Sequence, residues 1–128
     1  MVVATLHTID SVSTVDRIID VFPPHNQEQI RYQVASVLVA IICQRLLQRD
    51  DKKGRVLACE VLIANDAIKN LIKEKKTNQI EHIIKTSSSL GMQLMDDSIK
   101  NLYKQGLITY DTAMTAVKNP IIFKKSLE

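Results

Sequence analysis

The chain contains little glycine, few aromatic residues and no tryptophan. Among its 128 residues are three glycines, and aromatic side chains make up 4%. A phosphate-binding loop needs two glycines with four residues between them, followed by Lys and Ser or Thr, and a dinucleotide fingerprint needs three closely spaced glycines. Because the glycines are Gly54, Gly91 and Gly106, the sequence contains neither motif.

Cysteine is equally scarce. Cys43 and Cys59 both stand inside apolar segments, so we expect buried free thiols in a reducing compartment. Neither they nor His7, His25 and His82 show a spacing typical of zinc ligands, and no metal site is predicted. No Ser or Cys stands in a nucleophile elbow. Composition and spacing therefore reveal no complete active site.

Long apolar runs and a strong charge of one sign are also missing. The longest apolar run, Val37–Cys43, is far shorter than a membrane span of about 18 residues. No secretory signal is visible at the start. Seventeen basic and fourteen acidic side chains give a net charge of +3, which is too mild to indicate a nucleic-acid or anionic-membrane partner. With 45% hydrophobic residues, the composition is that of one globular domain.

Apolar patterning in the first half predicts strands at both ends of a helical stretch. Val2–Asp10 has the composition of a buried strand that carries His7. A short helix capped by Ser13 or Thr14 is expected to end at the Pro23–Pro24 pair. A long helix from Gln27 to Leu46 is apolar on nearly every face and is predicted to be buried.

A hairpin and four short helices are expected to follow. Asp50–Gly54 is predicted to be a charged turn. The segment after it, Arg55–Ala64, is predicted to be a strand, and it is too apolar to be solvated on one face. The segment before the turn, "RLLQR", can pair with this strand as a hairpin. The first of the four helices is predicted to be capped by Asn65 or Asp66, and the second by a capping box of Asn78 with Glu81. The third should run from Asp96 to a left-handed stop at Gly106, and the fourth should begin at a Thr109 cap and end before Pro120.

Several motifs occur in one fixed order. They are "TLHT", "TVDRIIDVFPPH", "QEQIR", "QRLL", "EVLI", "AIKNLIKE" and "GMQLMDDSIKNLYKQGLITYDTA". In this order they resemble the C-terminal part of the twitching-motility ATPases, the PilT family of secretion-type motors that retract type IV pili. "TLHT" resembles the family's histidine box, and "AIKNLIKE" resembles its retraction signature, with Lys69 and Lys73 where arginine is more usual.

The resemblance implies a helix-rich α/β fold, namely the C-terminal part of a RecA-like P-loop ATPase domain without its phosphate-loop half. Residues 1–64 would be the remnant of the motor core, with a short β-hairpin, and residues 65–128 a terminal helical region. In the intact family protein, ATP and Mg²⁺ are bound, the motor is a homohexamer, and a pilus platform protein at the inner membrane is the partner. The implied location is cytoplasmic and peripheral to that membrane. Alone, the chain is predicted not to hydrolyse ATP.

The resemblance also implies which residues act. His7, with Thr5 and Thr8, would lie near the terminal phosphate of the nucleotide, and only in the intact protein. A neutral imidazole both donates and accepts a hydrogen bond, which suits this role. The alternative is that His7 is a buried polar residue satisfied by neighbouring backbone. Arg17 and Arg31 would reach a subunit interface, or else they are solvated arginines on amphipathic helices.

Two further features have open interpretations. The retraction signature should place an apolar face in the core and a basic face against a partner or a neighbouring subunit, or else that basic face is simply solvated; its residues are Ala67, Ile68, Lys69, Asn70, Leu71, Ile72, Lys73 and Glu74. Glu60 interrupts an apolar strand, and a structural ion pair with Arg45 or Arg55 is expected. The competing function for the whole chain is a freestanding helical interaction module that binds motor components without catalysis.

Overall fold

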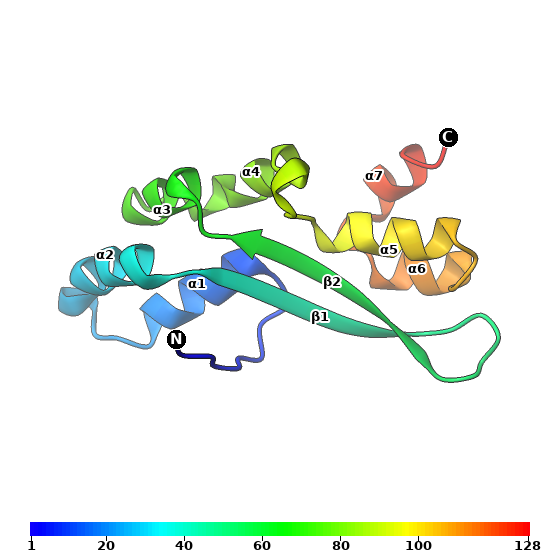
Figure 1. Cartoon of the computed structure of the whole chain (residues 1–128), viewed down its shortest axis with the longest axis horizontal. Coiled ribbons are helices and arrows are strands. Elements are labelled where there is room, and N and C mark those ends of the chain that lie inside the picture. The colour runs from blue at the N-terminus through cyan, green and yellow to red at the C-terminus, as the bar shows by residue number, and fades with distance from the viewer.

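A computed structural model describes all residues, 1–128. The elements, in chain order, are α1 (Ser11–Asp20), η1 (Pro24–Asn26), α2 (Gln27–Val37), β1 (Ala40–Gln48), β2 (Arg55–Ile63), α3 (Asp66–Lys73), η2 (Thr77–Gln79), α4 (Ile80–Thr86), η3 (Ser88–Leu90), α5 (Met95–Lys104), α6 (Tyr110–Ala116) and α7 (Pro120–Lys125). Figure 1 shows a long hairpin with α1 and α2 near one end and α5 to α7 towards the other. The helix-rich α/β class is therefore confirmed.

The β-hairpin is antiparallel and in continuous register, from Ala40 opposite Ile63 to Gln48 opposite Arg55. Its turn contains the predicted charged residues, with Arg49 bonded to Asp51. Helix α5 packs along β2, and the Ser98 hydroxyl of α5 accepts a bond from the Cys59 amide at 3.1 Å. The strand prediction over Arg55–Ala64 is confirmed to within one residue.

The long helix predicted over Gln27–Leu46 is wrong. Helix α2 ends at Val37, because Leu38 adopts an extended conformation with φ −61° and ψ 128°. From Ala40 onward the chain pairs with β2 along nine residues. Ile41, Cys43 and Leu47 alternate towards the core, a period of two that β-branched residues suit. Cross-strand pairing has overridden a helical apolar pattern.

The N-terminal segment is also not a strand. Residues 1–8 form no regular structure, and the side chains of Val2 and Val3 are 94% and 82% exposed. A strand needs the backbone groups of a neighbouring strand as hydrogen-bond partners. The sheet consists of β1 and β2, neither of which pairs with this segment. The prediction of a buried strand over Val2–Asp10 is therefore wrong.

The predicted helix caps and stops are right at some helices and wrong at others. Asn65 and Thr109 cap α3 and α6 as expected, and the chain turns at Gly106 with φ +70°. Asp10, not Ser13 or Thr14, caps α1. Asn78 and Glu81 form no capping box, because η2 enters α4 directly through Gln79, without a side-chain cap. Helix α7 was missed; its cap is Asn119.

The core lies between the inner hairpin face and the helices. One cluster of 21 buried apolar residues draws on the hairpin and on all seven α-helices, α1 to α7. The outer hairpin face stays open: Ile42, Leu46 and Leu57 are 61%, 59% and 45% exposed. The expectation that the Arg55–Ala64 strand is buried on both faces is thus wrong. No helix is long and apolar enough to cross a bilayer.

Candidate functional site

The histidine segment lies on the surface. Thr5, Leu6, His7 and Thr8 line an open hollow of about 450 Å³, and Arg17 of α1 is its fifth lining residue. His7 is exposed, not buried, so the alternative reading of a buried polar histidine is wrong. Folding therefore brings together four of the predicted site residues: Thr5, His7, Thr8 and Arg17.

This segment is attached to the first turn of α1. The hydroxyls of Thr8 and Thr14 are hydrogen-bonded at 2.6 Å, and the Thr14 hydroxyl donates to the Asp10 carbonyl at 2.7 Å. Asp10 itself accepts the Ser13 amide at 2.7 Å. His7 is therefore held by its neighbour Thr8, although it belongs to no helix or strand.

Arg31 lies elsewhere. Its guanidinium donates to the Ile72 carbonyl at 3.5 Å, at the end of α3, where a cation is favourable to the helix dipole. Its Nε is buried and has no hydrogen-bond partner. Arg31 is half-buried, so it links α2 to the signature helix and does not join the hollow beside His7.

Glu60 forms no ion pair, so the predicted pair with Arg45 or Arg55 is wrong. Its side chain is 4% exposed, and its carboxylate accepts the amide hydrogens of Ser11 at 2.8 Å and Met95 at 3.3 Å. Arg45 instead donates to the Ala116 carbonyl at the end of α6. Backbone donors thus satisfy this buried carboxylate, a type of partner that sequence spacing does not reveal.

The two cysteines are free, as predicted; Cys43 is buried and Cys59 is half-buried. Burial and the nearby Glu60 carboxylate raise the pKa of the Cys43 thiol. A raised pKa keeps the thiol protonated and weakly nucleophilic. Among the 128 residues, no group of three His, Cys, Asp or Glu side chains could hold a metal ion.

The signature helix α3 divides largely as expected. Ile68 and Ile72 are 0% exposed, and Asn70 is exposed. Ala67 departs from the prediction, because it is exposed and not part of the core face. Lys69 and Lys73 are half-buried, so their aliphatic stems cover apolar surface while the ammonium groups stay in water.

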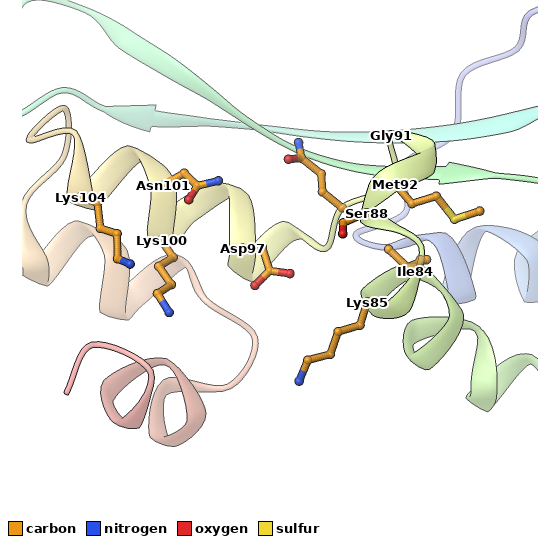
Figure 2. A pocket seen from close by; sticks show the side chains of 10 residues that line it. Ile84, Lys85, Ser88, Gly91, Met92, Asp97, Lys100, Asn101 and Lys104 are labelled. Carbon is orange, nitrogen blue, oxygen red and sulfur yellow. The ribbon is translucent and has the colours of Figure 1, made fainter.

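A groove between α4 and α5 was not anticipated. It has a volume of about 460 Å³, and Figure 2 shows Lys85, Lys100 and Lys104 extending towards the same side. Asp97 lies between them. None of these lysines takes part in the chain's salt bridges. The groove can attract an anionic group, and no spacing rule within one helix would have identified it.

Lys118 joins three separate elements. Its ammonium pairs with Asp10 at 3.2 Å and with Glu81 of α4, and the Glu81 bond is the first cause that raises its pKa. Burial alone would raise the pKa of Asp10, but hydrogen bonds from Ser13 and the charge of Lys118 lower it overall. The N-cap of α1 is therefore tied electrostatically to α4 and to the linker after α6.

Comparison with known proteins assigns this arrangement to a class. A twitching motility protein of Neisseria gonorrhoeae is 44% identical over 119 residues, which are 93% of this chain and 32% of that protein. The type IV pilus retraction ATPase PilT of Pseudomonas aeruginosa is 39% identical over 94% of this chain and 35% of its own length. The chain thus spans about one third of the curated relatives it matches. No family model matches it.

Solved structures agree with the sequence comparison. A crystal structure of the pilus retraction motor PilT with bound ADP superposes with a TM-score of 0.79 at 44% identity, covering 94% of this chain and 33% of that one. The ATPase DotB of Legionella pneumophila shares the fold at 20% identity, with a TM-score of 0.70 over 85% of this chain and 29% of that one.

The fold is therefore shared with one part of the pilus retraction motor PilT and of the ATPase DotB. More particularly, the chain is homologous to the twitching-motility ATPases of the PilT family, and the resemblance carried by its ordered motifs is confirmed.

Proposed function

We propose that this chain is the C-terminal segment of a hexameric, ATP-hydrolysing motor that retracts type IV pili. The observation that carries the proposal is 44% identity over nearly the whole chain to a twitching motility protein. A second is the superposition with PilT bound to ADP. Residues 1–64 would belong to the motor core and residues 65–128 to its helical region. The assembled motor would work in the cytoplasm, at the inner membrane beside a pilus platform protein.

In this proposal, the hollow beside His7 faces the nucleotide. A neutral imidazole can accept a hydrogen bond from the attacking water or donate one to the terminal phosphate. Thr5 and Thr8 add hydroxyl groups on either side, and Arg17 adds a positive charge at the same hollow. Arg17 is exposed, which also suits a contact with a neighbouring subunit.

The remaining parts of the nucleotide site are not supplied by this chain. Its three glycines form no phosphate-binding loop, and no three of its His, Cys, Asp or Glu side chains form a group that could hold a metal ion. Phosphoryl transfer depends on such a loop and its metal. We therefore propose that the chain contributes His7 and Arg17 to a site completed by other residues of the motor, and that alone it is inactive.

The signature helix would supply a contact for a partner or a neighbouring subunit. Lys69 and Lys73 stand four residues apart on α3 with like charges, a pairing that mildly destabilises a helix. Both residues are half-buried, as expected when the stem of a lysine covers apolar surface and its charged end reaches water. The proposed contact is therefore a basic surface supported by a rigid, buried Ile68–Ile72 face.

A segment exchange tests the proposal. The matched third of a Pseudomonas-type retraction ATPase is replaced by residues 1–128, and ATP hydrolysis and twitching are measured. Hydrolysis above that of the same motor lacking this third would support the proposal. A folded, nucleotide-binding chimera without hydrolysis would contradict it.

One observation favours the competing function, an interaction module without catalysis. The groove contains Lys85, Lys100 and Lys104, which form no salt bridge within the chain, and its one acidic lining residue is Asp97. It could therefore bind an acidic segment of another protein. The coding sequence before Met1 distinguishes the two. A reading frame that continues upstream into a Gly-Lys-Ser/Thr loop supports the motor, and a genuine start at Met1 supports the module.

A further inference from the structure

Glu60 occupies an unusual position in the core. It belongs to β2, faces inward opposite Cys43, and is 4% exposed. No basic side chain pairs with it among the chain's salt bridges. Burying a carboxylate without a partner is costly, so its two backbone donors must supply the stabilisation.

Those donors are the first residues of two different helices. Ser11 begins α1 and Met95 begins α5, and their amides donate to the two separate oxygens of Glu60 at 2.8 and 3.3 Å. The first amides of a helix lack partners within the helix, and the helix dipole places positive charge at the same end. One carboxylate therefore interacts favourably with both helix starts.

At neither helix does the capping residue supply a side-chain acceptor for the first amide. The cap of α5, Leu94, makes no side-chain hydrogen bond, so Glu60 acts as its cap from another strand. At α1, Asp10 accepts the Ser13 amide, which leaves the Ser11 amide for Glu60. If Glu60 is replaced by a side chain that can accept only one hydrogen bond at this site, either the Ser11 or the Met95 amide is left buried without a partner.

The first turn of α1 also holds the histidine segment. Ser11 is followed three residues later by Thr14, whose hydroxyl binds that of Thr8 at 2.6 Å. Thr8 is the residue after His7 and lines the same hollow. A displacement of the start of α1 is therefore passed to His7 through one turn of helix and one hydrogen bond.

We propose that Glu60 is a positioning residue that ties the starts of α1 and α5 together and thereby fixes the segment carrying His7. The tie itself depends only on the contacts described above. Its consequence for ATP hydrolysis rests on the proposed function. Glu60 would not touch the nucleotide; it would act through Ser11, Thr14 and Thr8.

The tie can be tested on this chain without nucleotide. Glu60→Gln keeps the shape of the side chain but replaces one acceptor oxygen by a donor group. We expect amide exchange at Ser11 or Met95 to accelerate about tenfold or more, since a bond to a charged acceptor is lost. The side-chain NMR signals of Thr8 and His7 should shift as well.

A matched control separates this effect from general destabilisation. Leu62→Val changes a 0% exposed residue on the same face of β2 without altering a polar contact. The two variants are compared at the temperature at which their free energies of unfolding are equal. There, Leu62→Val should leave the NMR signals of Thr8 and His7 at the positions they have in the unaltered chain. Equal shifts in both variants, or protected amides in Glu60→Gln, would overturn the proposal.

A second variant serves if Glu60→Gln does not fold. Ser11→Pro removes the amide donor together with the Ser11 hydroxyl, which has no hydrogen-bond partner, and proline is well tolerated at the first position of a helix. Asp10, which precedes it, is already extended at φ −147° and ψ 172°, as a residue before proline must be. Unchanged Thr8 and His7 signals in this variant would overturn the proposal.

The intact motor containing this segment separates the two levels of the argument. Glu60→Gln there should lower kcat about tenfold or more while KM and ring assembly stay unchanged. If wild-type hydrolysis is absent, the proposed function fails, while the tie stands on the NMR result. If wild-type hydrolysis is present and kcat of Glu60→Gln is normal, the positioning role of Glu60 is overturned and the proposed function survives.

Discussion

The buried face of the signature helix α3 gives a quantitative test of the packing. Ile68 is 0% exposed, so Ile68→Val removes one methylene group from a filled core, at a cost of about 1 kcal/mol. For 128 residues, the entropy of unfolding is about 0.27 kcal/mol/K. The midpoint of thermal unfolding should therefore fall by about 4 °C.

The assay is thermal unfolding followed by far-UV circular dichroism at constant protein concentration. The control is Asn70→Ala, on the exposed side of the same helix, which should change stability by less than about 0.5 kcal/mol. Equal midpoints for Ile68→Val and the unaltered chain would show that α3 does not pack its apolar face as described. Equal losses in both variants would lead to the same conclusion.

Three further predictions concern the isolated chain. Titration with ATP and Mg²⁺ should show no saturable hydrolysis, because no phosphate-binding loop is present; a rate that survives repurification would contradict this. The open hairpin face should drive self-association, and Leu46→Lys, at a 59% exposed position, should reduce it in light scattering, whereas a monomer at all concentrations would refute the role of this face. The pKa of Asp10 is lower than its ordinary 3.8, so the stability that its charge contributes is present above about pH 4 and is lost as the pH falls through its folded-state pKa. Asp10→Asn should therefore reduce the loss of stability at acid pH. Equal losses of stability in the variant and the unaltered chain would show that the charge of Asp10 does not matter.

Local signals predicted the second half of the chain well. The caps Asn65 and Thr109 and the stop at Gly106 depend on hydrogen bonds and backbone geometry within a few residues, which the sequence displays directly. The Ile68–Ile72 face followed from helical spacing in the same way. Helix α7 escaped because its six residues, Pro120–Lys125, are too few to show a period.

Non-local pairing explains the main errors. The segment Ala40–Gln48 contains apolar residues at spacings that fit both a helix and a strand, and only its nine-residue register with β2 decides between them. Val2–Asp10 has a strand-like composition, but strand structure depends on a neighbour that composition does not supply. Both errors concern where a partner strand lies.

In the candidate site, too, local motifs were predicted from the sequence and long-range contacts were not. The ordered motifs predicted a site at His7 and its two threonines, and the structure shows that Arg17 lines the same hollow. The position of Arg31 away from this hollow could not be predicted, since its bond to Ile72 joins residues 41 positions apart. The role of Glu60 was equally hidden, because backbone amides 49 and 35 positions away are its partners.

The His7→Ala variant of the intact motor that contains this segment tests the central claim most directly. Hydrolysis rate, nucleotide affinity and thermal midpoint are measured on one preparation. Because His7 would act mainly in the transition state, the rate should fall about 100-fold or more while affinity and midpoint stay unchanged. Normal hydrolysis, or activity lost only in step with unfolding, would contradict the account.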